Sequence, residues 1–292
     1  MSALAAVEFQ SNWLEVLQSP FMQNALIGGS LVAIAAGLLG YFVITRQNAF
    51  AAHALAHIGF PGATGAILVG APVTLGLAVF CVAGGLLIGV FGRRVADREV
   101  ATGTILALAT ALGVLFASLA SANASTTTSV LFGNLLAISD DQLLVFGAFT
   151  VAVVLALAVL ARPLVFASVD PAVAEARGVP VRGLGIAFVV LLALTITMAV
   201  QVVGTLLLFA LVVTPAATAL RITARPGLVA ALAVALALGS VWGGLVLSAM
   251  VDLPPSFFIV SLAVLAWLVG LASAGRRHRP VEPRSMDHHH PH

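Results

Sequence analysis

The chain of 292 residues is too apolar for a water-soluble domain, because 61% of its residues are hydrophobic and only 8% are charged. Its mean hydropathy is +1.14, a value that a soluble fold of this size cannot present to solvent. A helical span needs about 20 apolar residues, which leaves room for roughly eight to ten spans and little else. The composition therefore excludes a soluble globular fold and a separate catalytic or nucleotide-binding domain.

The charged residues and the single cysteine exclude several further classes of site. All 13 basic residues are arginines, and a P-loop needs a lysine, so any ATP must be hydrolysed by another chain. Cys81 has no second cysteine to pair with, which excludes a disulfide framework and a Cys-based zinc site. The arginines stand in short runs between apolar stretches, which gives no reason to expect a nucleic acid partner.

Continuous apolar stretches predict an all-α integral membrane protein, a polytopic bundle of nine transmembrane helices with eight as the alternative. The spans are expected at 24–45, 49–70, 73–92, 101–120, 142–161, 184–200, 203–220, 227–249 and 256–274. Together they make up a transmembrane region over residues 21–275. Segment 1–20 has the apolar spacing of an interfacial helix, and residues 276–292 form an Arg- and His-rich tail.

The arginine positions decide the predicted orientation. With nine spans every arginine falls on one side of the membrane, which the positive-inside rule makes cytoplasmic together with the C-terminus. The break at Gln201–Gly204 is the point on which the count depends. Fusing the two segments around this break gives eight spans and sends arginines to both faces, so nine spans are preferred.

Two short pieces are predicted not to cross the membrane. Ser125–Ser139 contains an apolar run, Leu131–Leu136, that is too short to span and is interpreted as a re-entrant or surface helix outside. Ser168–Gly183 lies on the cytoplasmic side, with Asp170 and Pro171 suited to start a helix and Gly178 suited to end it. This second piece is either a docking helix for a partner or a well-capped loop.

An ionisable pair inside the second span is the most informative local feature. His53 and His57 are spaced i and i+4, so both lie on one helical face about 6 Å apart. Ionisable groups at bilayer depth mark ion or substrate routes, and neutral imidazoles are preferred ligands of zinc and similar metals. Pro61 and Gly62 predict an irregular helix at this point, tolerated where it lines protein or a cavity.

Two other interpretations of the pair remain open. The histidines can be structural, hydrogen-bonded to carbonyl groups of neighbouring helices. An intramembrane metalloprotease needs a glutamate directly after the first histidine, and Ala54 stands there.

Further histidines stand in the tail. They are His278, His288, His289, His290 and His292. Such a tract can gather metal at the cytoplasmic exit, or it can be an added affinity tag.

Several stretches match the signature segments of one family. They are Ala52–His57 with Pro61–Gly62, Leu131–Leu136, Asp170–Pro180, Val203–Ala219 and the Leu253–Pro255 turn. On these residues the chain resembles the permease of ABC importers for zinc and manganese, which are related to the cobalamin and iron-siderophore permeases. The resemblance covers residues 24–275.

The resemblance implies partners and site residues. The expected assembly is a homodimer of this chain with the path on its two-fold axis, two cytoplasmic ATPase subunits, and an extracytoplasmic solute-binding protein, in the lipids of a bacterial plasma membrane. The ATPase-coupling helix would comprise Asp170, Pro171, Glu175, Arg177 and Gly178. No permanently bound cofactor is expected, because Zn²⁺ or Mn²⁺ would be transient cargo.

The path residues expected from this resemblance are His53 and His57, with Asn123, Asn134 and Gln201 as polar candidates. The family usually has aspartate where this chain has His53. Two imidazoles favour zinc over the oxygen-preferring manganese, so zinc is expected first and manganese next.

An ion- or proton-coupled secondary carrier that uses the histidine pair is the alternative from another class. Such carriers often show an internal repeat and mid-membrane charges, and neither is evident here. A membrane enzyme is a weaker alternative, because the glutamate that a metalloprotease needs is missing after His53.

Overall fold

A computed structural model describes residues 13–91, 95–119, 133–251 and 253–275 of the chain. Within these ranges every regular element is a helix, and eight helices are long and apolar enough to cross a membrane. The predicted class, an all-α polytopic membrane protein, is confirmed. The elements are α1 (Trp13–Gln18), α2 (Pro20–Thr45), α3 (Ala49–Val69), α4 (Val73–Phe91), α5 (Val95–Leu119), η1 (Leu135–Ala137), α7 (Asp140–Val169), α8 (Pro171–Ala176), α9 (Val181–Val212), α10 (Thr214–Ile222), α11 (Pro226–Val251) and α12 (Pro255–Gly275).

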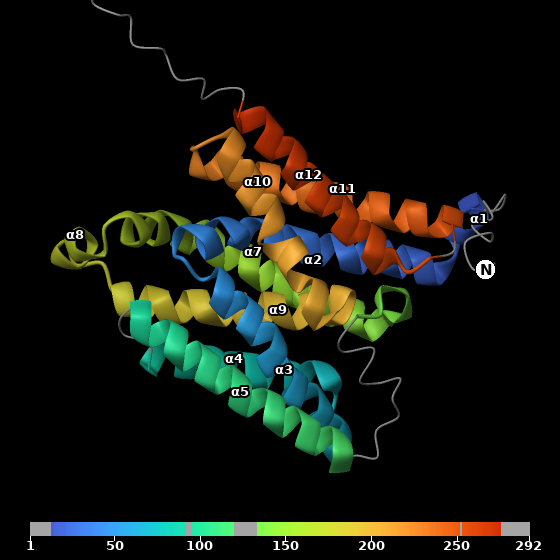
Figure 1. The fold of residues 1–292 in the computed structure, drawn as a ribbon, viewed down its shortest axis with the longest axis horizontal. Coiled ribbons are helices and arrows are strands. Elements are labelled where there is room, and N and C mark those ends of the chain that lie inside the picture. Colours follow the sequence, from blue (N-terminus) through green and yellow to red (C-terminus); the bar gives the residue numbers. More distant parts are fainter. Residues whose placement is uncertain (1–12, 92–94, 120–132, 252, 276–292) are drawn as a thin grey trace, which may run out of the picture.

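The predicted span 203–220 is not a long helix of its own. Its residues are divided between the end of α9 and the short helix α10. Gly204 has non-helical backbone angles, φ 81° and ψ 169°, so α9 is kinked there. Figure 1 shows the chain turning back after this kink towards the end of the molecule at which α9 begins. The break at Gln201–Gly204 is therefore real, while the count of nine crossings stays a prediction.

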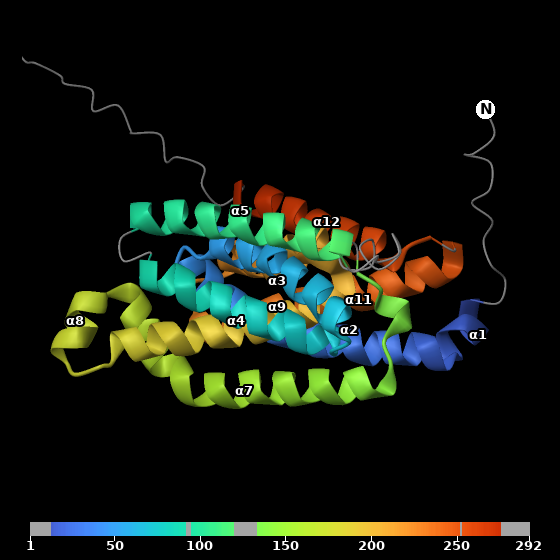
Figure 2. The same ribbon diagram turned by 90° about the horizontal axis from the view of Figure 1, so that it is seen from below.

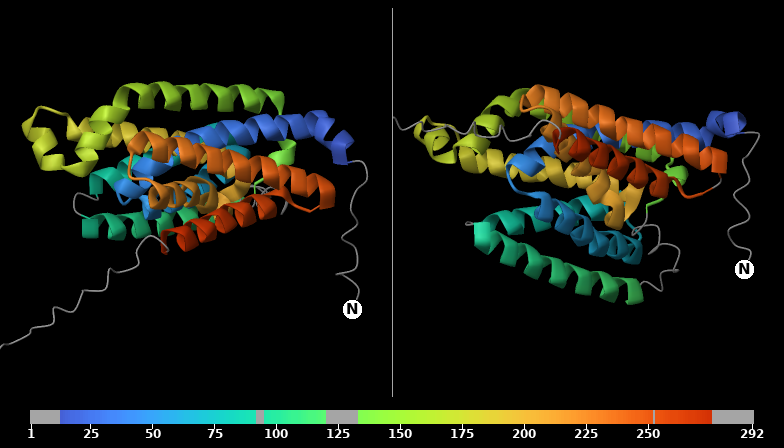
Figure 3. Two further views of the ribbon diagram at one scale, coloured as in Figure 1. Left: turned by 90° about the horizontal axis from the view of Figure 1, so that it is seen from above. Right: turned by 45° about the horizontal axis from the view of Figure 1, so that its top comes forward.

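The helices form two groups with α9 between them. Figure 1 shows α3, α4 and α5 packed together on one side of α9, and α2, α11 and α12 on the other. Figure 2 shows α7 on the opposite side of the molecule from α5 and α12, and the views in Figure 3 agree. The short helix α8 projects beyond the other helices at one end (Figure 1).

Small residues bring helix backbones into direct contact within each group. A Cβ atom at Gly62 of α3 would clash with the carbonyl oxygen of Gly76 in α4. A Cβ atom at Gly37 of α2 would lie 2.7 Å from the backbone nitrogen of Val234 in α11. Such close approach provides dispersion contacts in a bilayer, where helix association has no hydrophobic drive. These glycines hold α3 against α4 and α2 against α11.

Helix α7 begins with a capping box. The Ser139 hydroxyl accepts a hydrogen bond from the Gln142 amide (3.3 Å), and the Ser139 amide donates to the Gln142 side chain (3.1 Å). This reciprocal pair satisfies two backbone donors that a helix start leaves without partners.

Helix α7 then runs through Pro163 to Val169, beyond the predicted end at residue 161. A proline is tolerated inside a membrane helix because neighbouring groups take up the hydrogen bond that it breaks.

Candidate functional site

The two histidines of α3 lie one helical turn apart, as their spacing predicts. The ring centroids of His53 and His57 are 4.8 Å apart, and the ring planes meet at 77°. The i and i+4 spacing places both imidazoles on the same side of the helix.

The pair forms the accessible part of an otherwise buried helix segment. Between Ala52 and Thr64 every residue is buried except His53 and His57. The buried residues pack against α4, α5 and α9. The surrounding helices thus enclose α3 on its other faces and leave only the imidazoles accessible.

An aromatic ring from a distant part of the sequence borders the site. The Phe209 ring lies 6.3 Å from the His53 ring, centroid to centroid, and is 42% exposed. Phe209 belongs to the part of α9 that follows the Gly204 kink. Sequence reasoning identified the break at Gly204 but missed Phe209, because 156 residues separate it from His53 and no local pattern connects them.

Two polar atoms at the site lack their usual partners. His53 Nδ1 is buried and has no hydrogen-bond partner among the described residues. Pro61 has no N–H group, so it cannot donate to the carbonyl oxygen of His57 four residues earlier, which loses its helical donor. A buried polar atom without a partner, such as His53 Nδ1, is costly. Here both atoms belong to the two residues that form the pair.

The irregular helix predicted at Pro61–Gly62 is wrong. Helix α3 is continuous from Ala49 to Val69, with Pro61 inside it. The Thr64 hydroxyl donates to the carbonyl oxygen of Phe60 at 3.1 Å and also lies 3.4 Å from that of Gly113 in α5. Helix α3, packed against α4 and α5, is therefore continuous through Pro61 although the His57 carbonyl lacks its helical donor.

The pair does not form a closed metal centre within one chain. No group of three or more His, Cys, Asp or Glu side chains that could hold a metal converges within the described ranges. Two imidazoles supply only half of the four ligands of a tight structural zinc site. The arrangement suits brief contact with a passing ion.

Gln201 joins four elements near the kink of α9. Its side-chain oxygen accepts hydrogen bonds from Thr74 Oγ1 in α4 (2.9 Å) and Gln142 Nε2 in α7 (3.2 Å). Its amide group donates to the carbonyl oxygen of Thr197 (3.1 Å). Its own carbonyl accepts from the backbone amide of Asn134, just before η1 (3.1 Å). Gln201 thus fixes the outer segment and two neighbouring helices to α9, and its role in the path stays a prediction.

The other predicted path and tail residues divide between described and undescribed parts of the chain. Asn134 is exposed and bonded through its backbone to Gln201. Of the apolar run Leu131–Leu136, the structure describes residues 133–136, of which Leu135 and Leu136 lie in the single turn η1. Asn123 and the tail histidines lie outside the described residues.

The short helix predicted within Ser168–Gly183 is present with both caps as expected. The Asp170 side chain accepts a hydrogen bond from the Val173 amide at 3.0 Å, and Pro171 is the first residue of α8. Gly178 has φ +80° and donates to the Glu175 carbonyl, while Val179 donates to the Ala174 carbonyl. These two bonds are the pattern that ends a helix at a left-handed glycine.

The surface of α8 is charged and accessible. Glu175 and Arg177 are exposed, and only Ala174 of this helix is buried. Helix α8 is capped at both ends, projects from the end of the bundle and contacts α7 and α9.

Comparison with known proteins identifies the family. Residues 18–274 match the ABC 3 transport family. The chain is 31% identical over 250 residues to the manganese transport system membrane protein MntC of Halalkalibacterium halodurans, covering 85% of this chain and 86% of that one. It is 34% identical to the manganese import system permease protein ScaB of Streptococcus parasanguinis, covering 69% and 72% of the two chains.

Solved structures agree with this assignment. PsaBC from Streptococcus pneumoniae in complex with Fab contains a chain that superposes with a TM-score of 0.80 at 28% identity, covering 89% of this chain and 95% of that one. An inward-facing conformation of a putative metal-chelate type ABC transporter shares the fold, with a TM-score of 0.69 at 16% identity over 93% and 94% of the two chains. The family match, together with the eight apolar helices, confirms the expected localisation as a multi-pass membrane protein. The chain belongs to the ABC 3 transport family and is a permease subunit of a metal importer of the ATP-binding-cassette type.

Proposed function

We propose that this permease carries a divalent transition metal across the bacterial plasma membrane through a path lined by His53 and His57. The observation that carries the proposal is the enclosure of α3, which leaves only these two side chains accessible between Ala52 and Thr64. Intramembrane ionisable groups are costly unless they serve a route or a partner. Two donors bind a dication weakly enough to release it, which transport requires.

A second copy of the chain would complete the path. The histidine pair and Phe209 are accessible from outside a single chain, and facing lipid would be costly for the imidazoles. Helices α5 and α12 are the least buried of the spans, and Figure 2 shows them on one side of the molecule with α3 between them. A homodimer formed across this side would place two histidine pairs about a common axis and cover the exposed apolar faces.

The donor chemistry supports zinc as the first cargo and manganese as the second. Imidazole suits zinc, whereas manganese prefers carboxylate and carbonyl oxygens. The relatives are named for manganese. Both ions therefore belong in the same uptake experiment.

The energy for transport would come from separate chains. No lysine is present for a P-loop, so two ATPase subunits would bind below the dimer and act through α8. The coupling residues proposed are Asp170, Pro171, Glu175, Arg177 and Gly178. A metal-loaded solute-binding protein would deliver the ion at the opposite end.

The test is metal uptake in cells that lack their own high-affinity zinc importer and carry this permease with its ATPase and binding protein. The informative variant is His53→Phe/His57→Phe, which keeps two aromatic rings for packing but removes the nitrogen donors. We expect zinc accumulation in the wild type that requires ATP hydrolysis and collapses in the variant. His53→Gln/His57→Gln, with weak donors at the same positions, should fall between the two.

Two results would contradict the proposal. Unchanged uptake by a well-expressed Phe variant would make the histidines structural. Uptake that persists with an inactive ATPase would favour an ion-coupled carrier, which the family assignment does not support.

A further inference from the structure

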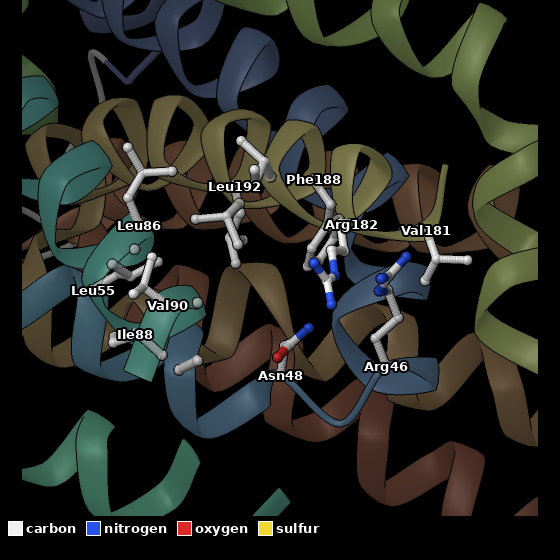
Figure 4. Close-up of a pocket in the computed structure, with 16 residues that line it drawn as sticks. Arg46, Asn48, Leu55, Leu86, Ile88, Val90, Val181, Arg182, Phe188 and Leu192 are labelled. Atoms are coloured by element: carbon white, nitrogen blue, oxygen red, sulfur yellow. The ribbon is translucent and has the colours of Figure 1, made fainter. Parts of the chain in front are cut away.

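A cavity of about 600 Å³ lies between α3, α4 and α9 at the end of the molecule where α9 begins. It is separate from the histidine pair, because neither His53 nor His57 lines it. The first turns of α3, the last turns of α4 and the first three turns of α9 form its walls. Figure 4 shows the side chains that line it.

One side of this cavity is cationic. Arg46, Arg182 and Asn48 all line it, and Figure 4 shows these three polar side chains together on one side. The Arg46 guanidinium lies over the Phe188 ring, 5.3 Å from its centroid, which holds the group in place. Among the described residues that line the cavity, none is acidic. Two guanidinium groups and an amide donor therefore converge on a space suited to an anion.

The remaining walls are aliphatic. Figure 4 shows Leu55, Leu86, Ile88, Val90 and Leu192, which line the cavity, on the side away from the two arginines. Leu192 is eleven residues into α9, which corresponds to a depth of about 16 Å along the helix. The cavity is thus amphipathic, with a cationic mouth at the helix ends and an apolar interior within the membrane-spanning region.

We propose that this cavity binds one anionic phospholipid, with its phosphodiester on Arg46 and Arg182 and an acyl chain along the aliphatic walls. Guanidinium groups bind phosphate oxygens through strong, charge-assisted hydrogen bonds. Basic pockets between transmembrane helices on the cytoplasmic side are suited to anionic headgroups. The arginine-bearing end of this chain is the one that the positive-inside rule makes cytoplasmic.

A lipid fits this shape better than a segment of a cytoplasmic protein. The aliphatic walls extend far below the level of the helix ends, where an acyl chain belongs and a polar peptide segment would leave its backbone groups without hydrogen-bond partners. The exposed charges of α8 supply a protein docking surface elsewhere.

The test is native mass spectrometry of the purified full-length chain, titrated with phosphatidylglycerol or with phosphatidylcholine of the same acyl chains. We expect one phosphatidylglycerol per chain, bound at least about tenfold more tightly than phosphatidylcholine, because both lipids carry the same phosphodiester but choline adds a cation that the two arginines repel. Arg46→Gln/Arg182→Gln should weaken phosphatidylglycerol binding by about tenfold or more. Arg182→Gln alone, at an exposed position, should weaken it without risk to the Arg46–Phe188 contact.

A steric variant tests the cavity without changing charge. A Cβ atom at Gly89, which lines the cavity, would meet no atom within 4 Å, so Gly89→Leu fills the space without a clash at its first carbon. Gly147 of α7 is equally open and lies outside the cavity, which makes Gly147→Leu the matched control. Gly89→Leu should lose the bound lipid, and Gly147→Leu should keep it.

Further experiments distinguish a phospholipid from free inorganic phosphate as the ligand of the cavity. Millimolar inorganic phosphate should not displace phosphatidylglycerol, because it lacks the acyl chain. Displacement by phosphate would show a simple anion site and overturn the proposal. Equal binding of the two lipids, unchanged binding by the arginine and Gly89 variants, or loss of the lipid when the ATPase subunit binds would overturn it as well. None of these outcomes depends on metal transport.

Discussion

Gly133 and Gly204 meet backbone to backbone, although 71 positions separate them in the sequence. A Cβ atom at Gly133 would lie 2.5 Å from the backbone nitrogen of Gly204. Both residues have positive φ angles, +75° and +81°. The outer segment before η1 is thus seated directly on the kink of α9, and the neighbouring bond from the Asn134 amide to the Gln201 carbonyl holds it there.

Alanine at either glycine should therefore destabilise the protein. Gly204 has φ 81° and ψ 169°, a region that residues with a Cβ atom occupy at a cost of about 1–3 kcal/mol. We expect Gly204→Ala to lower the thermal unfolding midpoint of the purified protein in detergent. Gly147→Ala, at an open helical position of α7, is the control and should leave the midpoint unchanged or raise it. An unaltered midpoint in Gly204→Ala would show that the kink relaxes freely.

Replacing His53 by aspartate should change the order of metal preference. His53→Asp creates a carboxylate and imidazole pair, which suits manganese better than two imidazoles do. We expect the ratio of manganese to zinc uptake to rise, on the order of tenfold for a change of 1.4 kcal/mol in relative binding. Competition between the two ions in cells that carry the complete importer measures this ratio. An unchanged ratio would mean that selectivity is set elsewhere, for example by the solute-binding protein.

Removing the N-cap of α8 should uncouple ATP hydrolysis from transport. Asp170→Ala removes the acceptor for the Val173 amide, a loss of about 1 kcal/mol that acts on a helix of six residues. We expect slower metal uptake for each ATP hydrolysed by the reconstituted complex. Ser139→Ala removes the equivalent cap at the other end of α7 and should leave this ratio unaltered. Equal effects of the two variants would assign both caps to stability alone.

Gln201→Leu should destabilise the bundle more than a typical surface substitution. The change leaves the Thr74 hydroxyl and the Gln142 amide without their shared acceptor; both side chains are half-buried, so the cost of each is below the roughly 1–3 kcal/mol of a fully buried unpaired group. The thermal midpoint of Gln201→Leu should recover partly in Gln201→Leu/Thr74→Val, because the second change removes one of these groups. Absence of any recovery would indicate that the loss comes from packing.

Local sequence patterns predicted the features that depend on neighbouring residues. The spacing of His53 and His57, the caps of α8 at Asp170 and Gly178, and the break before Gly204 all follow from interactions within a few positions. The apolar stretches placed six of the eight long helices within six residues at each end, while α7 extends eight residues further than expected, from 161 to Val169, and α9 continues through its kink to Val212 instead of ending at 200.

Features that depend on contacts across the bundle could not be predicted in the same way. Phe209 beside His53, the Gly133–Gly204 contact and the cavity at Arg46 and Arg182 each join residues that are far apart in the sequence. The proline in α3 favoured an irregular helix when considered alone, but α3, packed against α4 and α5, is continuous. Short-range patterns carry no information on such packing.

The backbone contacts at Gly62–Gly76 and Gly37–Val234 have a mechanical consequence. Close-packed backbones cannot slide past one another without opening voids, so α3 with α4 and α2 with α11 each move as a rigid body. The histidines belong to the first body, whereas Phe209 lies in the segment of α9 beyond the Gly204 kink. A change in the 6.3 Å separation between the His53 and Phe209 rings would therefore report movement of this part of α9 relative to the body formed by α3 and α4.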